Sequence, residues 1–141
     1  AATPQQKFEA AVARVCELRA AARATTDQVN EAWTALRTGI VASRKLGDLL
    51  DACPEECMHH ALEFVLERGV QKKAARGQVR ECLRVLLARP PWLGFVRRGE
   101  GLPARAREAL DGEQDAELIA QVAAPQELEE EAAAEEEPED A

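Results

Sequence analysis

The sequence predicts an all-α fold: a single antiparallel bundle of about four main helices, followed by short C-terminal helices and an acidic tail. Alanine supplies 28 of the 141 residues, and tyrosine is absent. Val, Ile and Thr are sparse beside Ala, Leu, Glu and Arg, which are good helix formers. Large apolar residues also recur at the spacing of one helical face. A chain of this length should build one modest core.

The N-terminal part of the chain predicts two helices. Residues 4–23 carry their large apolar residues on one helical face, so they should form the first helix. Thr25 and Gln28 fit a capping box, in which each side chain bonds the backbone N–H of the other residue, so a second helix should begin there. The apolar stripe of this second helix changes register, which predicts a bend between Gly39 and Lys45.

The middle of the chain predicts two more main helices. Pro54 suits the first position of a helix, which should run to Arg68 and end at Gly69. The next helix should cover about residues 70–89, because the prolines after it would stop it. If that helix were straight, its basic and apolar faces would overlap. It should therefore kink at Gly77 or project beyond the bundle.

The segment after these helices is less regular. Residues from Pro90 to Pro103 are rich in Pro and Gly yet include two aromatic residues, so we expect an irregular loop. A short helix should run from Pro103 to Leu110. Residues 114–122 have the apolar spacing of one more helix.

Charge changes sign along the chain. All 18 Lys and Arg residues precede Asp111. The net charge is −3 over residues 1–67, +9 over residues 68–107 and −14 over residues 108–141. The overall value of −8 therefore describes no single surface that a partner would meet.

The acidic stretch also sets the predicted domain boundary. Residues 1–111 should form a helical bundle domain, and residues 112–141 an acidic C-terminal extension. The extension has too few large apolar residues to offset the entropy cost of ordering, so it should be largely disordered when free. Two roles stay open for it: it folds back on the basic residues and competes with an anionic ligand, or it only improves solubility.

The basic segment, residues 68–107, is the strongest functional signal. It borders an aromatic loop on a chain that is acidic overall. We therefore expect a non-catalytic interaction protein: a small helical subunit, adaptor or assembly factor of a larger complex, which docks a protein partner through this segment. The residues expected to contact the partner are Lys72, Lys73, Arg76, Arg80, Arg84, Trp92, Phe95, Arg97 and Arg98.

Other interpretations of the basic segment remain open. One is an RNA- or DNA-binding component of a ribonucleoprotein particle, in which Trp92 or Phe95 stacks on bases and the acidic tail competes internally. The absence of an RNA-binding motif disfavours this alternative. Another is that the basic segment binds an anionic lipid surface. The last is a solvated helix face, with both aromatic residues folded over the end of the bundle.

The cysteines suggest a further, weaker alternative, a thiol or zinc protein. The sequence CPEECMHH places Cys53, Cys57 and His60 on one helical face, and Cys16 or Cys82 would complete a zinc site. A helical CxxxC pair lacks the knuckle geometry of most zinc sites, so we assign no metal and no cofactor. A disulfide between Cys53 and Cys57, or between Cys16 and Cys82, is also open. Buried thiols are the favoured interpretation.

Catalysis is not expected. Ser43 is the only serine, His59 and His60 are the only histidines, and no glycine-rich loop precedes a helix. The longest apolar run, Val85 to Ala88, is too short to cross a membrane. The chain should therefore be a soluble intracellular protein, in the cytoplasm or inside an organelle after removal of a presequence.

Overall fold

The computed structural model describes residues 3–123, and every regular element in that range is a helix. The all-α class is confirmed. The predicted acidic tail from residue 124 onward lies outside the described residues. The elements are α1 (Pro4–Ala20), α2 (Thr26–Ala42), α3 (Gly47–Asp51), α4 (Glu55–Gln71), the 3₁₀ turn η1 (Lys73–Ala75), α5 (Arg76–Leu86), α6 (Pro90–Arg98), α7 (Leu102–Ala109) and a helical segment over residues 116–123.

Matching capping boxes begin α1 and α2. The Thr3 hydroxyl accepts from the Gln6 backbone N–H at 3.1 Å, and Gln6 Oε1 accepts from the Thr3 backbone N–H at 3.0 Å. Thr25 and Gln28 repeat this arrangement at 3.1 and 2.9 Å. The predicted capping box is therefore confirmed.

The bend expected after Gly39 is a complete break between α2 and α3. Ser43 closes α2: its backbone N–H and its hydroxyl both donate to the Gly39 carbonyl, at 3.1 and 2.8 Å. Ser43 is buried there, so its hydroxyl has a structural role. α3 then begins at Gly47 as a separate short helix.

α4 passes through its predicted end at Gly69. A Cβ at this position would lie 2.4 Å from the Ala109 carbonyl oxygen, so glycine is needed for the close crossing of α4 and α7. The chain leaves the helical conformation at Lys72 instead, with φ −129° and ψ 100°. The predicted kink at Gly77 is wrong, because the break precedes it and Gly77 lies in the first turn of α5.

The segment from Pro90 to Pro103, predicted to be an irregular loop, contains α6. The prolines occupy the first positions of this helix, where the missing N–H has no helical partner to lose. Trp92 is 0% exposed, and its indole N–H donates to the Leu50 carbonyl at 2.8 Å. α6 therefore packs on α3 and helps to close the core.

The folded part of the chain continues beyond the boundary predicted after residue 111. The short helix expected before that residue is present as α7. Residues 112–123, which we assigned to the acidic extension, also belong to the packed structure. Leu118 is 7% exposed and Val122 is 2% exposed, and both belong to the main core. The apolar spacing that predicted a helix here was therefore the better guide than net charge.

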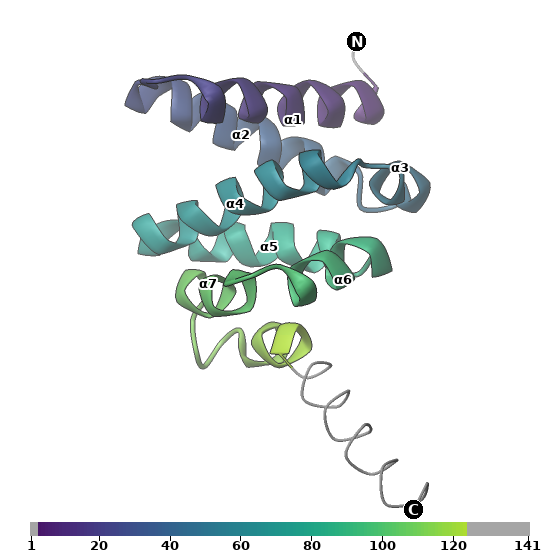
Figure 1. Ribbon diagram of the computed structural model, residues 1–141, viewed down its shortest axis with the longest axis vertical. Coiled ribbons are helices and arrows are strands. Elements are labelled where there is room, and N and C mark those ends of the chain that lie inside the picture. The colour runs from purple at the N-terminus through teal and green to yellow at the C-terminus, as the bar shows by residue number, and fades with distance from the viewer. Residues whose placement is uncertain (1–2, 124–141) are drawn as a thin grey trace, which may run out of the picture.

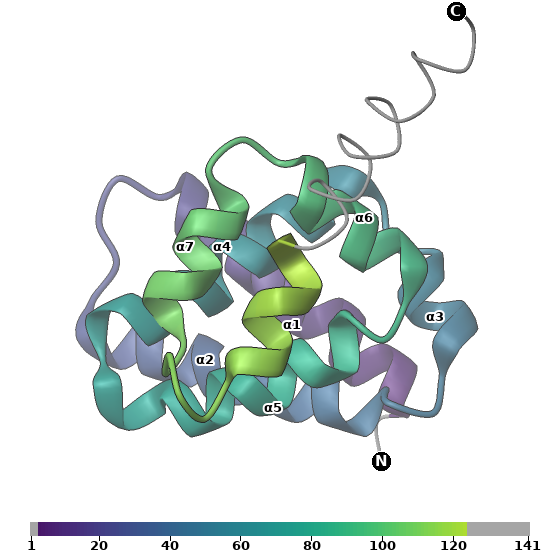
Figure 2. The same ribbon diagram turned by 90° about the horizontal axis from the view of Figure 1, so that it is seen from below.

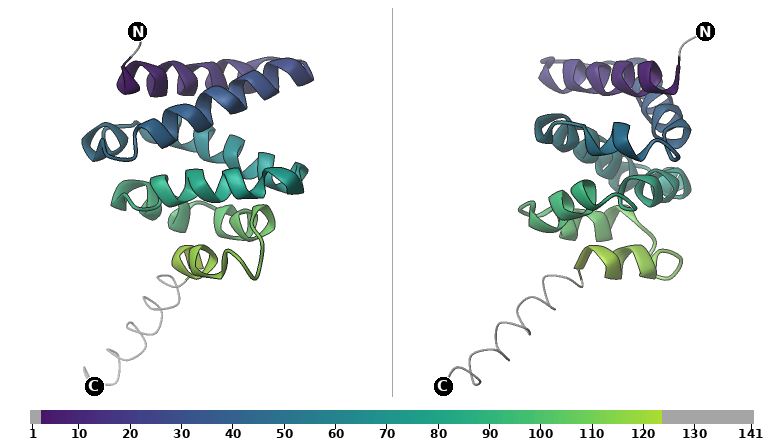
Figure 3. Two further views of the ribbon diagram at one scale, coloured as in Figure 1. Left: turned by 180° about the vertical axis from the view of Figure 1, so that it is seen from behind. Right: turned by 90° about the vertical axis from the view of Figure 1, so that its right-hand side faces the viewer.

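The helices form three hairpins that follow one another along the long axis of the molecule (Figures 1 and 3). The hairpins are α1 with α2, α4 with α5, and α7 with residues 116–123. Equivalent helices of successive hairpins run parallel: Trp33 of α2 donates to Gln78 of α5 at 2.9 Å, and Arg37 lies 3.3 Å from Glu81. The view from below shows α7 and residues 116–123 over the earlier hairpins (Figure 2). The predicted single antiparallel bundle is not confirmed.

The first two hairpins share one pattern of buried residues, displaced by 50 positions. Buried residues of α1 and α4 correspond as Phe8 with Met58, Ala11 with Ala61, Val12 with Leu62 and Val15 with Val65. Those of α2 and α5 correspond as Ala32 with Cys82, Trp33 with Leu83 and Leu36 with Leu86. Four of these seven pairs differ in residue type and three are identical, so the repeat is clearer in the burial pattern than in the sequence.

Candidate functional site

Several arginines of the basic segment join hairpins to one another. Arg80 of α5 pairs with Asp115, which is 1% exposed. Arg76 donates to two backbone carbonyls, that of Gly69 at 3.2 Å and that of Glu108 at 2.9 Å. Both arginines thus fasten the second hairpin to the third. Their predicted role as contacts for a partner conflicts with these internal bonds.

Arg89 and Arg97 are also bound internally. Arg89 donates to both carboxylate oxygens of Asp51, at 2.9 and 2.5 Å. These hydrogen bonds are the main reason that the pKa of Asp51 is lowered and that of Arg89 raised. Arg97 donates to the Gln121 carbonyl through Nε and Nη2, at 3.1 and 2.9 Å. Asp51 and Gln121 lie on α3 and on the last helical segment, so these bonds also connect separate elements.

The prediction that Trp92 is an exposed anchor is wrong, because the side chain is completely buried. Phe95 is half-buried and packs against the core. Arg98 is exposed, and the 3.9 Å that separates it from Glu55 makes at most a weak surface pair. Four of the predicted contact residues remain on the surface, namely Lys72, Lys73, Arg84 and Arg98.

A hollow of about 380 Å³ lies beside the turns of the first two hairpins. We call it the Arg19–Arg68 hollow. Its lining residues are Leu18, Arg19, Ala24, Val29, Phe64, Glu67, Arg68 and Gln71. Exposed Lys72 follows the lining residue Gln71 directly in the chain, so this hollow adjoins the exposed lysines.

Arg68 is held firmly at this hollow. Its Nη1 donates to Asn30 Oδ1 at 2.9 Å, and its guanidinium lies over the Trp33 ring, 5.7 Å from the centroid. Its Nε is buried without a hydrogen-bond partner. Asn30 and Trp33 therefore fix the guanidinium plane while leaving one of its buried donors unsatisfied.

Arg19 approaches the same hollow from α1. Its Nη1 makes one long hydrogen bond, 3.5 Å to the His60 carbonyl. Within residues 3–123, no ion pair joins either Arg19 or Arg68 to a carboxylate. Sequence reasoning did not single out Arg19, because it belongs to residues 1–67, whose net charge is −3, and lies outside the basic segment. Only the parallel packing of α1 on α4 brings it near Arg68.

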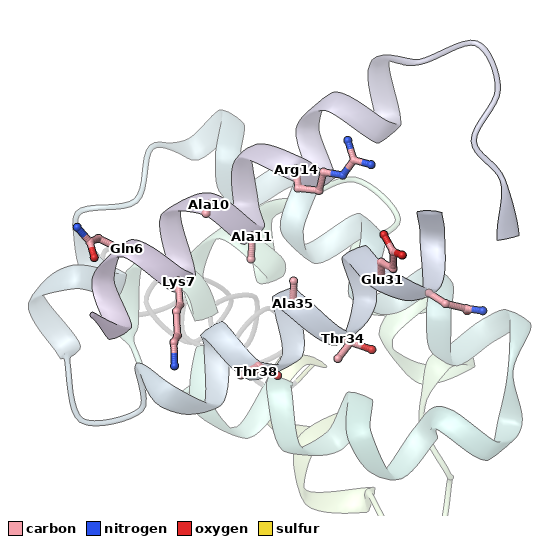
Figure 4. Close-up of a pocket in the computed structure, with 10 residues that line it drawn as sticks. Gln6, Lys7, Ala10, Ala11, Arg14, Glu31, Thr34, Ala35 and Thr38 are labelled. Carbon is pink, nitrogen blue, oxygen red and sulfur yellow. The ribbon is translucent and has the colours of Figure 1, made fainter. Parts of the chain in front are cut away.

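A broader groove of about 810 Å³ is lined by residues of α1 and α2 alone. Ala11 and Ala35 point toward one another across it, and Gln6, Arg14 and Glu31 lie around it (Figure 4). The groove shares no lining residue with the Arg19–Arg68 hollow, so the two are separate sites.

Three of the four free cysteines meet between the first two hairpins. Cys16 of α1 and Cys53 both neighbour Cys57 in the first turn of α4. Burial first, and then proximity to Cys57, raise the pKa of Cys16 and raise that of Cys53 to about 12. Burial also raises the pKa of Cys82 to about 12. At least these three thiols are therefore held protonated at neutral pH.

The thiol cluster does not extend into the zinc site that the CPEECMHH segment suggested. His60 Nδ1 is buried without a partner, and the His60 ring lies 5.5 Å from the ring of His59. In the described part of the chain, no group of three or more His, Cys, Asp or Glu side chains is arranged to hold a metal ion. Cys53, Cys57 and His60 are thus close in sequence without forming a ligand set.

Comparison of the chain with protein-family models, with curated proteins and with solved structures finds no match. None of the helices between residues 3 and 123 has both the length and the apolar character that a membrane span requires. Any function assigned to the chain therefore rests on the geometry of its own residues.

Proposed function

We propose that this chain is a non-catalytic interaction protein, a small helical subunit or adaptor that docks an acidic segment of a protein partner. The docking surface is the turn edge of the first two hairpins, with Arg19, Arg68, Lys72 and Lys73. Stacked helical hairpins offer extended side surfaces of this kind for binding. This proposal keeps the start of the basic segment as the contact and gives up the aromatic loop.

One observation carries the proposal: two guanidinium groups from separate hairpins line one hollow, and neither has a carboxylate partner among residues 3–123. Arg76, Arg80 and Arg89 show what this protein does with its other partly buried cations, which is to bond them internally. Arg68 is partly enclosed and has no such carboxylate, which favours an external anion, and the exposed Arg19 lines the same hollow. Lys72 and Lys73 would guide an acidic segment toward that hollow.

The test is a comparison of captured partners. The parent chain, a Lys72→Glu/Lys73→Glu double variant and an Arg84→Glu control are each used to recover proteins from an extract of the source cells. We expect the parent and the control to recover the same partner and the double variant to lose it. Equal recovery by all three proteins would contradict docking at this edge.

The nucleic-acid alternative is separated by a titration with single-stranded RNA across a salt series. Burial of Trp92 removes one of the two stacking residues considered for that alternative, and the other, Phe95, is half-buried. RNA binding that falls steeply with salt, and that needs Lys72 and Lys73, would favour nucleic acid over an acidic protein segment.

A further inference from the structure

We infer that the Arg19–Arg68 hollow is a carboxylate pocket, which receives one Glu or Asp side chain of the partner together with an adjacent apolar side chain. The inference rests on the proposed function and deepens it, because it names the chemistry that the partner segment must carry.

The need for an anion follows from the state of Arg68. The Arg68 side chain is partly buried. Its Nη1 donates to Asn30, and its Nε is buried without a hydrogen-bond partner. A buried donor on a charged group is costly to leave unsatisfied, and a carboxylate is the acceptor that matches a guanidinium edge. Local movement of the lining residues on binding would bring the ligand within reach of this edge.

The orientation of Arg68 is set before the ligand arrives. Asn30 and the Trp33 ring hold the Arg68 guanidinium in one orientation, so little side-chain entropy remains to be lost on binding. Arg19 enters from the neighbouring hairpin and is bound only by its long contact with the His60 carbonyl. It is therefore the arginine that is free to close on the ligand.

The lining charges limit the ligand to a single carboxylate. Arg19 and Arg68 face one acid, Glu67, whose Oε1 accepts from Gln71 at 3.0 Å. The remaining net charge is enough to balance one carboxylate. Glu67 lowers the positive charge of the hollow, so one carboxylate is balanced there better than a doubly charged phosphate.

The rest of the pocket is apolar. Leu18 and Phe64 are 9% and 8% exposed and form part of its lining with Val29. Such a wall contributes nothing to binding an inorganic anion, but it favours an apolar side chain next to the carboxylate. A peptide in which each Leu is flanked by Glu residues supplies both groups.

The experiment uses a fluorescein-labelled peptide, GEELEELEG, titrated with the full chain at low ionic strength. Saturable binding by fluorescence anisotropy is expected, together with no binding of GQQLQQLQG. Arg68→Gln and Arg19→Gln should each weaken binding by about tenfold, because each removes a charge-assisted hydrogen bond. Arg84→Gln removes an exposed cation away from the hollow and should leave binding unchanged within about twofold.

Two results would overturn the pocket: no saturable binding of the acidic peptide by the parent chain, or equal weakening by Arg84→Gln, Arg19→Gln and Arg68→Gln. Arg19→Gln should not disturb the fold, since Arg19 makes only one long hydrogen bond, so weaker binding by this variant reports on the pocket itself. The thermal unfolding midpoint of each variant serves as the folding control. If Lys72→Glu/Lys73→Glu loses the partner while both arginine variants bind the peptide normally, the carboxylate pocket is contradicted and docking at the turn edge is still supported.

Discussion

At the scale of single residues, Asp115 joins the third hairpin to the second. One carboxylate oxygen accepts from Arg80, and the other accepts from the backbone N–H of Asp111 at 2.8 Å. We expect Asp115→Ala to lower the free energy of unfolding by about 3 kcal/mol, because it removes the carboxylate partner of the partly buried Arg80 guanidinium and leaves only the neutral Gln114 side chain at 2.8 Å. Urea unfolding followed by circular dichroism measures the change.

Glu117→Ala is the matched control for that substitution. Glu117 is an exposed acid in the helical segment that directly follows Asp115, and its removal should change the free energy of unfolding by less than about 0.5 kcal/mol. Similar losses for the two variants would show that the pair between Arg80 and Asp115 does not hold the hairpins together.

The cysteines give a second prediction at this scale. With their pKa raised to about 12, Cys53 and Cys82 should carry far less thiolate at pH 8 than an ordinary cysteine. The difference amounts to roughly a thousandfold, since each pKa unit changes the thiolate fraction tenfold. Alkylation by iodoacetamide, followed by peptide mass spectrometry, should therefore be slow at both residues in the folded chain and fast in urea. Rapid labelling of Cys53 in the folded chain would contradict this environment.

At the scale of helices, local sequence signals predicted where a helix begins better than where it ends. The capping box at Thr25 was predicted correctly, because it depends on two residues of one turn. The helix end at Gly69 was wrong, because the glycine is required by α7, a segment distant in sequence. Pro90 was interpreted as a stop although a proline also suits the first turn of a helix. Local sequence gives no means of choosing between these uses.

Gly69 and Gly77 form a matched pair that tests this distinction. A Cβ at Gly69 would lie 2.9 Å from Ala109 Cβ and closer still to the Ala109 carbonyl, whereas a Cβ at Gly77 meets nothing within 4 Å. We expect Gly69→Ala to destabilise the chain by about 2 kcal/mol or more through separation of α4 and α7. Gly77→Ala should stabilise it by about 0.5 kcal/mol through helix propensity.

Thermal unfolding measures the change in stability that each glycine substitution causes. The two substitutions add the same methyl group to glycines in helices, so they differ chiefly in what the new atom meets. Opposite shifts of the unfolding midpoint are the expected result. An unchanged or raised midpoint for Gly69→Ala would mean that the crossing of α4 and α7 is looser than the structure shows.

At the scale of the whole molecule, the helical class followed from composition, but the arrangement in stacked hairpins did not. Four of the seven corresponding buried pairs differ in residue type, such as Trp33 and Leu83, so the repeat has only a weak sequence signature. The candidate site was only partly predictable for the same reason. Arg68 belonged to the predicted basic segment, whereas Arg19 joins it through packing of α1 against α4.

The last prediction concerns the third hairpin as a unit of the stack. A chain that ends at residue 111 lacks the buried side chains of Leu118 and Val122 and the partner of Arg80. Loss of this burial alone should lower the free energy of unfolding by about 3 kcal/mol, and the unfolding midpoint by roughly 10 °C. A chain that ends at residue 123 keeps every one of these contacts and is the control. If both shortened chains melt together, residues 112–123 add nothing to the core, and the boundary inferred from charge would be the correct one.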